Sequence, residues 1–282
     1  MRRWSNATQW PNGIVPQSGD NVTLNGNWTV LLDVDPAALD YFIIDGTLFA
    51  DDTRDVSITA NSIYIRAGNI SAGGVGNPFV HKFVIQINGQ KNDLGFVIDP
   101  LIAANKFMVV TGSLNLFGKA PNSVNTYLTQ TATAGTNILH VGDKTDWVAG
   151  DTLVLSPSFS TRTEYETVTI QSINIDGSIT LNSSLLYTHY GSSSITINNN
   201  YGQLDTRTRV GHVNRNIKIM PGPDTTWGFT VIIYGHNDGN VTRIGNAMLR
   251  GVQFMDGGQY DTLNAPLRFW NSLNGNYSSS VT

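Results

Sequence analysis

The chain has 282 residues, a net charge of −4 and 40% hydrophobic residues, so it is long enough and apolar enough to form a folded core. Charged residues make up 13%, against about 25% in an average soluble domain. The 17 basic residues are scattered, which excludes the concentrated positive field that binds nucleic acid or an anionic membrane surface. No stretch has the ~18 uninterrupted apolar residues of a membrane span, and the absence of cysteine excludes disulfides and thiolate metal sites.

Residue usage predicts an all-β fold. Asn (29 residues), Gly (28) and Asp (19) punctuate stretches rich in Val, Ile, Thr, Tyr and Phe, whereas Glu occurs twice. This is the chemistry of short strands joined by tight turns. At the start of the chain, Met1–Trp4 leads into polar sequence instead of the apolar core of a signal peptide, so the targeting segment of a secreted form would lie outside this sequence.

A recurring apolar-x-Gly-x-apolar unit follows, with glycines at 46, 68, 89 and 112, which are 22, 21 and 23 residues apart. A fixed period of 20 or more residues indicates a solenoid, in which each coil repeats the same strands and turns. We therefore predict a right-handed parallel β-helix. The alternative is a meander sandwich with evenly spaced hairpins, because turn signals every 8–12 residues also suit sandwiches.

Three regions are predicted along the chain. Residues 4–120 form a glycine-rich β-solenoid domain. Residues 121–205 change register and contain separate alternating strands, which predicts a compact β-rich insert. Residues 206–282 return to strands between Gly- and Asn-rich turns, as at the start of parallel β-helix repeats, and end without a capping pattern, so we expect a fragment of a longer protein.

Several short motifs occur in a fixed order along nearly the whole chain. They are Trp4 to Trp10, Pro16-x-x-Gly19-Asp20-Asn21-Val22, Gly46-Thr47-Leu48, Trp147-x-x-Gly150-Asp151, Glu164-x-Glu166, Leu186-Tyr187-x-His189-x-Gly191 and Val210-Gly211 to Ile217. Together they resemble the glycine-rich G-eight (G8) domain of the fibrocystin-type proteins and the cell-surface hyaluronidases. The resemblance implies an extracellular glycoprotein with parallel β-helix repeats after the glycine-rich domain.

One departure bears on catalysis. The hyaluronidase branch has a Pro-Ile-His-Phe-His stretch where this chain has Pro266-Leu267-Arg268-Phe269-Trp270. Imidazole can transfer protons near neutral pH, whereas Arg stays protonated and Trp offers only an indole donor. This substitution argues against glycan cleavage and favours the fibrocystin branch, so we assign no catalytic residue and lean against an enzyme.

Other candidate chemistry has a simpler alternative in each case. Glu164 and Glu166 would point to the same face of a strand, roughly 7 Å apart, as a glycosidase pair might require, but a solvated strand face explains them equally well. Asp256 and Arg268 could form a functional pair or a surface ion pair. Asp33, Asp35, Asp51 and Asp52 could bind calcium or cap turns, and Gly73 to Gly76 looks like a phosphate-binding loop but lacks Lys and a following helix, which favours a turn.

The five histidines are isolated and form no zinc motif, so no metal or cofactor is expected; they are His81, His140, His189, His212 and His236. Seven Asn-x-Ser/Thr sequons are candidate N-glycosylation sites: Asn6, Asn21, Asn27, Asn69, Asn182, Asn240 and Asn276. Trp227 and Trp270, each beside polar residues, are candidate carbohydrate contacts, although most aromatic side chains are expected inside the coils.

We interpret the sequence as an extracellular or cell-surface structural or adhesive glycoprotein module of the secretory pathway. It would act by surface recognition or by end-to-end assembly, because an exposed coil end presents unpaired strand edges. Its expected partners are N-linked glycans, polysaccharide or other copies of itself. The alternative is a polysaccharide-binding or polysaccharide-degrading protein of the hyaluronidase type, and a third hypothesis is a bacterial surface adhesin in which the sequons would be idle.

Overall fold

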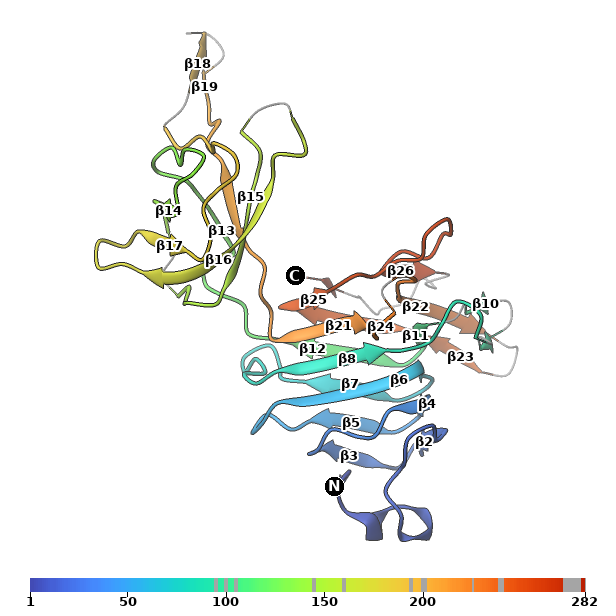
Figure 1. Cartoon of the computed structure of the whole chain (residues 1–282). Helices are drawn as coiled ribbons and strands as arrows, with labels where there is room; N and C mark the ends of the chain where they lie inside the picture. The colour runs from blue at the N-terminus through green and yellow to red at the C-terminus, as the bar shows by residue number, and fades with distance from the viewer. Residues whose placement is uncertain are drawn as a thin grey trace. The chain divides into compact units, whose positions relative to one another are not determined.

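A computed structural model of the chain is all-β and divides into two compact units (Figure 1). Unit 1 comprises residues 1–119 and 215–282, and unit 2 comprises residues 120–214. The structure describes residues 1–93, 96–98, 101–103, 106–143, 146–158, 161–192, 195–198, 202–224, 226–237, 241–270 and 280–281. Helical structure among them is limited to two 3₁₀ turns, η1 (Ala7–Gln9) and η2 (Pro11–Gly13).

The first sheet of unit 1 has seven strands, and every neighbouring pair is parallel. Chain order and spatial order coincide, so successive passes of the chain lie side by side (Figure 1). The strands are β1 (Arg2–Arg3), β3 (Thr29–Leu32), β5 (Thr47–Ala50), β7 (Asn69–Ala72), β12 (Ser113–Phe117), β24 (Asn246–Arg250) and β27 (Ser280–Val281).

The second sheet of unit 1 has ten strands and is parallel except for one antiparallel pair, β22 with β23. Its longest strand, β6, pairs with β8 through its first half and with β11 through its second half. Strands β8 and β11 therefore both lie along the same edge of β6 and belong to one continuous sheet. The strands are β2 (Val22–Leu24), β4 (Leu39–Ile44), β6 (Val56–Ile65), β8 (Phe83–Ile87), β11 (Phe107–Val110), β21 (Ile217–Pro221), β22 (Thr230–Asn237), β23 (Thr242–Ile244), β25 (Val252–Phe254) and β26 (Leu267–Trp270).

A short antiparallel hairpin, β9 (Val97–Ile98) with β10 (Leu101–Ile102), interrupts the chain between β8 and β11. The connection between β8 and β11 is therefore longer because it contains this hairpin, although both strands pair in register with β6. The all-β prediction is confirmed. The right-handed parallel β-helix is not confirmed, because both units also contain antiparallel strand pairs.

The core of unit 1 consists of apolar side chains stacked in register from strand to strand. In the first sheet one such row is buried across five consecutive strands, from β3 to β24, as the alternation of inward and outward side chains in a strand requires. It contains Val30, Leu48, Ile70, Leu114 and Ala247. Full burial of each large aliphatic side chain contributes about 1.5–3 kcal/mol, so the repeated row aligns neighbouring strands.

Glycines form a second repeated feature, at the corner between the two sheets. Each of these glycines immediately precedes a strand of the first sheet: Gly46, Gly68, Gly112 and Gly245. A Cβ on Gly68 would lie 2.0 Å from the Gly46 carbonyl oxygen, and one on Gly112 would lie 2.3 Å from the Gly68 carbonyl oxygen. Only glycine permits this approach of successive backbones.

Gly89 does not belong to this corner, which corrects the predicted repeat. Its neighbours are the Asn61 carbonyl oxygen and the Lys106 backbone, at the end of β8. Gly68 and Gly112 are direct neighbours in the stack, since the Ser113 N–H donates to the Gly68 carbonyl oxygen at 2.9 Å. The apparent spacing of 21 and 23 residues therefore divides a single pass of the chain into two.

Unit 2 is built from antiparallel strands around its own apolar core. The strand β20 pairs with both β13 and β15, so residues 206–214, which the sequence assigned to the resumed solenoid, lie in this unit. The strands are β13 (Asn125–Tyr127), β14 (Ile138–Leu139), β15 (Thr152–Leu155), β16 (Glu166–Ile173), β17 (Ile179–Leu181), β18 (Ile195–Asn198), β19 (Gly202–Leu204) and β20 (Arg209–His212).

Within the part of the chain that the structure describes, no helix has the length and apolar character to cross a membrane.

Candidate functional site

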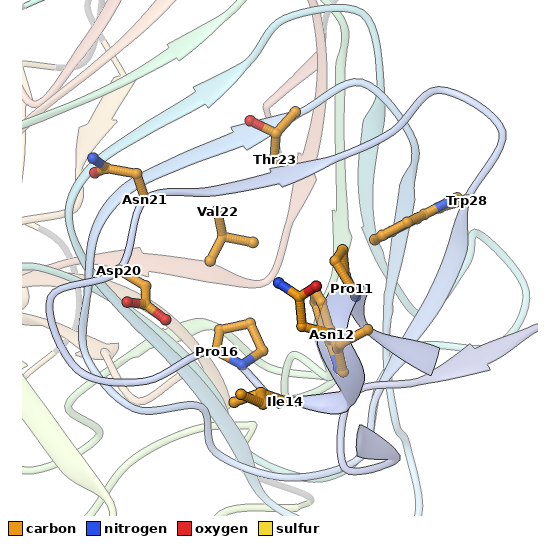
Figure 2. Close-up of a pocket in the computed structure, with 10 residues that line it drawn as sticks. Pro11, Asn12, Ile14, Pro16, Asp20, Asn21, Val22, Thr23 and Trp28 are labelled. Atoms are coloured by element: carbon orange, nitrogen blue, oxygen red, sulfur yellow. The ribbon is translucent and has the colours of Figure 1, made fainter. Parts of the chain in front are cut away.

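A pocket of about 380 Å³ lies beside the first strands of unit 1 (Figure 2). Its lining comes from the turn η2, from the loop between η2 and β2, from β2 itself and from Trp28, which directly precedes β3. We call it the N-terminal pocket. It is lined by Trp10, Pro11, Asn12, Ile14, Pro16, Asp20, Asn21, Val22, Thr23 and Trp28.

A row of aromatic rings connects this pocket to the core. Phe42 and Trp4 are fully buried and lie 5.6 Å apart, edge to face; Trp4 lies 4.8 Å from Trp10, and Trp10 lies 5.9 Å from Trp28. Such pairs contribute about 0.5–1.5 kcal/mol each beyond the area they bury. The Trp10 indole N–H donates to the Trp4 carbonyl oxygen at 2.8 Å. The wall of the pocket is therefore held in place before any ligand binds.

The sequence Pro11-Asn12-Gly13 explains the shape of the turn at the pocket. Proline is suited to the first position of a helical turn, and Asn12 and Gly13 both have positive φ, 62° and 68°. Asparagine and glycine are the residues that adopt this left-handed conformation most readily. Ile14, which follows the turn, lines the pocket and is 60% exposed.

Polar groups line the opposite side. Figure 2 shows Asp20 and Asn21 on the far side of the pocket from Trp28, and Val22 lies between this pair and Trp28. One carboxylate oxygen of Asp20 accepts the Gln17 N–H at 2.7 Å, and the Asn21 side-chain oxygen accepts the Tyr41 N–H at 3.2 Å. The Arg2 guanidinium lies 4.1 Å from the Trp28 ring centre. The pocket thus combines aromatic and proline surface with fixed hydrogen-bonding groups.

Glu164 and Glu166 lie in different surroundings. Glu166 begins β16 and is buried, whereas Glu164 lies in the preceding turn, where its N–H donates to the Thr161 carbonyl oxygen. Both oxygens of Glu166 are engaged, by the N–H groups of Leu186 and Tyr187 at 2.7 and 3.0 Å. The two side chains do not share one strand face, because the strand starts only after Glu164.

Glu166 instead pairs with a buried histidine that lies 23 residues away in the chain. Nε2 of His189 lies 2.8 Å from the Glu166 carboxylate and Nδ1 lies 3.1 Å from the Ser156 carbonyl oxygen. Both ring nitrogens of His189 therefore lie within hydrogen-bond distance of an oxygen atom. This pair fastens the segment 185–191 to β15 and β16, which is a structural role.

A second buried histidine is also paired. Nε2 of His212 lies 2.9 Å from the Asp151 carboxylate, which also accepts the Val148 N–H at 2.8 Å. The His212 ring lies 5.7 Å from the Trp147 ring. The motif Trp147-x-x-Gly150-Asp151 therefore closes a turn onto β20. Of the other histidines, His81 lies 3.6 Å from Asp52 and His140 is half-buried, and the His236 side chain lies outside the described residues.

The aspartates considered for calcium accept backbone N–H groups from neighbouring passes of the chain. Asp33 accepts from Ser5, Asp35 from Ser57, and Asp52 from Val80 and His81. Asp51 accepts from Thr53 within its own turn. Across the described ranges no group of three or more His, Asp or Glu side chains is arranged to hold a metal ion. These contacts satisfy turn donors, as the capping alternative predicts.

Gly73 to Gly76 forms a tight turn. Gly73 has φ of 66°, and Gly74 and Asn77 exchange backbone hydrogen bonds in an isolated bridge. No helix follows it, which confirms the turn in preference to a phosphate-binding loop.

Arg268 and Trp270 lie on β26. The Arg268 guanidinium is 4.1 Å from the Trp270 ring centre and 3.3 Å from the Asn264 side-chain oxygen. No ion pair joins Arg268 to Asp256, although both residues lie in the described part of the chain. Trp227 is half-buried, with the Lys91 ammonium 5.0 Å from its ring centre. Neither tryptophan lines the N-terminal pocket.

A buried cation that the sequence did not single out lies near the start of β11. Lys106 is fully buried, has φ of 60°, and donates from Nζ to the Asp224 carbonyl oxygen at 2.6 Å. Burial lowers the pKa of Lys106, and the nearby Asp224 carboxylate opposes that shift. No sequence signal separates this lysine from an exposed one.

The sequons differ in their surroundings. Asn21, Asn27 and Asn182 are exposed, and Asn6 and Asn69 are half-buried. The Asn6 side-chain oxygen accepts from the N–H and hydroxyl of Thr8, and the Asn69 side-chain oxygen accepts from Asn115 at 2.9 Å. Asn240 and Asn276 lie outside the described residues.

Stacked parallel strands, a glycine corner and a pocket beside the first strands define an all-β module with a preformed surface site. Residues 9–129 match the family model described as the G8 domain, so the chain carries a G8 domain and the predicted resemblance is confirmed. The chain is 30% identical to human fibrocystin-L over 280 residues, which is 91% of this chain and 6% of that protein.

Further relatives agree. Mouse fibrocystin is 34% identical over 158 residues, covering 55% of this chain and 4% of that protein, and protein rliB of Dictyostelium discoideum is 25% identical over 199 residues, covering 67% and 17%. The chain thus spans a small part of these relatives. Among solved structures, the Gp54 tailspike of an Acinetobacter baumannii bacteriophage matches 79% of this chain and 30% of its own, at 13% identity and a TM-score of 0.27, which is too low to support an argument.

Proposed function

We propose that the chain is an extracellular recognition module, in which stacked coils of a parallel β-helix form a scaffold and the N-terminal pocket binds a saccharide. The observation that carries the proposal is the pocket itself, which has a volume of about 380 Å³ and is lined by two indole rings and two prolines. Trp28 and Pro11 lie across it from Asp20 and Asn21 (Figure 2). That volume falls within the range of small-molecule sites, about 300–1,000 Å³.

The chemistry of the lining favours a sugar ring. Aromatic faces pack against the C–H surface of such a ring, while amide and carboxylate groups accept or donate hydrogen bonds to its hydroxyls. The indole wall is held by the row from Phe42 to Trp28, so little ordering entropy is lost on binding. A preformed wall of this kind supports recognition more than catalysis.

The extracellular location is supported by the similarity to fibrocystin and fibrocystin-L and by the exposed sequons. We propose that N-linked glycans occupy exposed positions such as Asn27 and Asn182, which makes the module a glycoprotein. Structural or adhesive roles and end-to-end assembly of coils belong to the same proposal.

Glycan cleavage of the hyaluronidase type has no comparable support. Both oxygens of Glu166 are engaged in the core of unit 2, Glu164 lies outside the strand, and Arg268 stacks on Trp270. None of these residues forms an open pair of acids beside a pocket.

A glycan array followed by titration calorimetry tests the proposal. The full chain is screened against hyaluronan fragments, chitin fragments and N-glycan cores. Trp28→Ala is expected to weaken binding to the best array ligand about two- to tenfold, which corresponds to the loss of about 0.5–1.5 kcal/mol of stacking. Asp20→Asn, which keeps an oxygen acceptor for Gln17, should weaken it less.

Trp227→Ala is the matched control, because Trp227 lies outside the pocket. Thermal unfolding of each variant separates loss of binding from loss of fold. Equal binding by Trp28→Ala and the parent chain, or no binding to any array member, would contradict a saccharide site in this pocket.

A further inference from the structure

We propose that an N-glycan on Asn21 covers the N-terminal pocket and so regulates access to it. This inference deepens the proposed function, since it rests on the chain passing through the secretory pathway and on a saccharide-binding pocket. It concerns one sequon among those exposed, chosen by its place in the structure.

The first argument is position. The whole sequon Asn21-Val22-Thr23 lines the pocket, at the start of β2. Asn21 and Thr23 are exposed, while Val22 is buried between them, as alternation along a strand requires. A glycan attached here begins at the pocket wall itself.

The second argument is the orientation of the Asn21 amide. Its oxygen accepts the Tyr41 N–H from β4 at 3.2 Å, which holds the side chain against the neighbouring strand. Its nitrogen Nδ2, the atom to which an N-glycan is joined, makes no hydrogen bond to any residue that the structure describes. Glycosylation therefore leaves the contact to Tyr41 intact and adds the sugar on the free side.

The third argument is the facing surface. Trp28 and Pro11 lie across the pocket from Asn21 (Figure 2). A sugar tethered at Asn21 reaches aromatic and proline surface of the kind that packs against its C–H face. The occupant is thus a saccharide of this same chain, and it resembles the ligand class that the pocket is proposed to bind.

Tethering sets the size of the effect. A group on a short flexible link has an effective concentration on the order of 1 mM. If the pocket binds a sugar with a dissociation constant on the order of 0.1 mM, the tethered glycan lowers the apparent affinity for a free saccharide about tenfold.

Asn27 provides a matched control. It is exposed in the turn before β3, carries its own sequon, and is adjacent in sequence to Trp28, but it does not line the pocket. A glycan there adds similar mass close to the same tryptophan without starting at the pocket wall.

The experiment compares the full chain secreted from mammalian cells with the same chain made in bacterial cells, which lacks N-glycans, and with secreted Asn21→Gln and Asn27→Gln. Peptide mass spectrometry measures occupancy at both sequons. Acrylamide quenching of tryptophan fluorescence measures access to Trp28, and N,N′-diacetylchitobiose serves as the free saccharide.

We expect Asn21 to be occupied, and the bacterial chain and Asn21→Gln to show stronger quenching and about tenfold tighter binding of the disaccharide than the secreted parent. Asn27→Gln should match the parent. Trp28→Phe should remove the quenching difference.

An unoccupied Asn21 beside an occupied Asn27, or equal quenching in parent and Asn21→Gln, overturns this inference and leaves the saccharide site standing. A quenching difference without disaccharide binding in the unglycosylated chain supports coverage by the glycan and counts instead against the proposed saccharide site.

Discussion

Different contacts hold neighbouring strands in register in the two units of this chain. In unit 1, parallel strands are aligned by repeated apolar rows and by a corner at which glycine backbones meet directly. In unit 2, antiparallel strands are fastened by two buried histidine–carboxylate pairs, Glu166 with His189 and Asp151 with His212.

Polar groups are placed differently in the two units. A stack of parallel strands can leave its turns at the edge, where Asp33, Asp35 and Asp52 accept N–H groups from adjacent passes. In unit 2, the segment after β17 carries the buried residues Leu185 and His189, and its Leu186 and Tyr187 N–H groups donate to the buried Glu166 carboxylate. Substitutions in each unit should therefore act through different contacts.

The largest effect is expected in unit 2, from Glu166→Ala. The change removes the acceptor for two backbone N–H groups and leaves a buried imidazole without its carboxylate. Breaking a buried pair in this way costs about 3–5 kcal/mol. Hydrogen exchange of the full chain should show faster exchange in peptides from 120–214 and little change in those from 1–93.

Glu164→Ala is the control, since Glu164 lies before the strand and its recorded contact is through its backbone. Equal exchange in the parent and Glu166→Ala would mean that the pair does not hold unit 2 together.

A smaller effect is expected in unit 1, from Gly68→Ala. The new Cβ would lie 2.0 Å from the Gly46 carbonyl oxygen, so two passes of backbone must separate. Overpacking of this kind costs about 1–3 kcal/mol, occasionally more. Chemical denaturation should show a lower free energy of unfolding. Hydrogen exchange should show that the backbone amides of β5, β7 and β12 lose the most protection.

Gly26→Ala is the matched substitution, because the nearest atom to its Cβ lies 3.8 Å away and its φ is not positive. Similar unfolding free energies for Gly26→Ala and Gly68→Ala would contradict the role given to the glycine corner.

The smallest effect concerns pH and Asp33. Burial by itself raises the pKa of Asp33, but hydrogen bonds from the Ser5 backbone and hydroxyl and from Arg3 outweigh it and hold that pKa below its usual range. A carboxylate with a lowered pKa stabilises the fold above its unfolded pKa of about 3.9, and the stabilisation is lost as pH falls further.

Because Arg3 is largely exposed, solvent screening limits the contribution to about 1 kcal/mol or less. Unfolding midpoints measured from pH 6 down to about pH 3 should therefore fall less steeply in Asp33→Asn than in the parent chain. If the unfolding midpoints of the two proteins fall equally with pH, Asp33 does not contribute to the pH dependence of stability.

Much of the fold was accessible from the sequence. Strand-forming residues between Asn, Gly and Asp turns predicted the all-β class, and the motifs from Trp4 to Ile217 indicated the G8 domain. The sequence spacing groups Gly89 with Gly46, Gly68 and Gly112, although only the last three lie at the same corner. A regular spacing in sequence looks the same whether one strand or a whole pass separates two glycines.

The candidate site was less accessible. Polar neighbours favour Trp227 and Trp270, whereas the pocket uses Trp10 and Trp28. Trp10 directly precedes the turn η2 and Trp28 directly precedes β3, and only tertiary packing brings their rings within 5.9 Å. Glu166 was chosen with Glu164 for their spacing, but its partner is His189.

Strand formation and turn formation depend on neighbouring residues, so the sequence by itself determined the all-β class and the resemblance to the G8 domain. Which strands pair, which glycines stack and which side chains line the pocket were decided only by the tertiary structure. The physical reason is that parallel neighbours are joined by connections of variable length, such as the one that holds β9 and β10, so register depends on long-range packing and not on spacing along the chain.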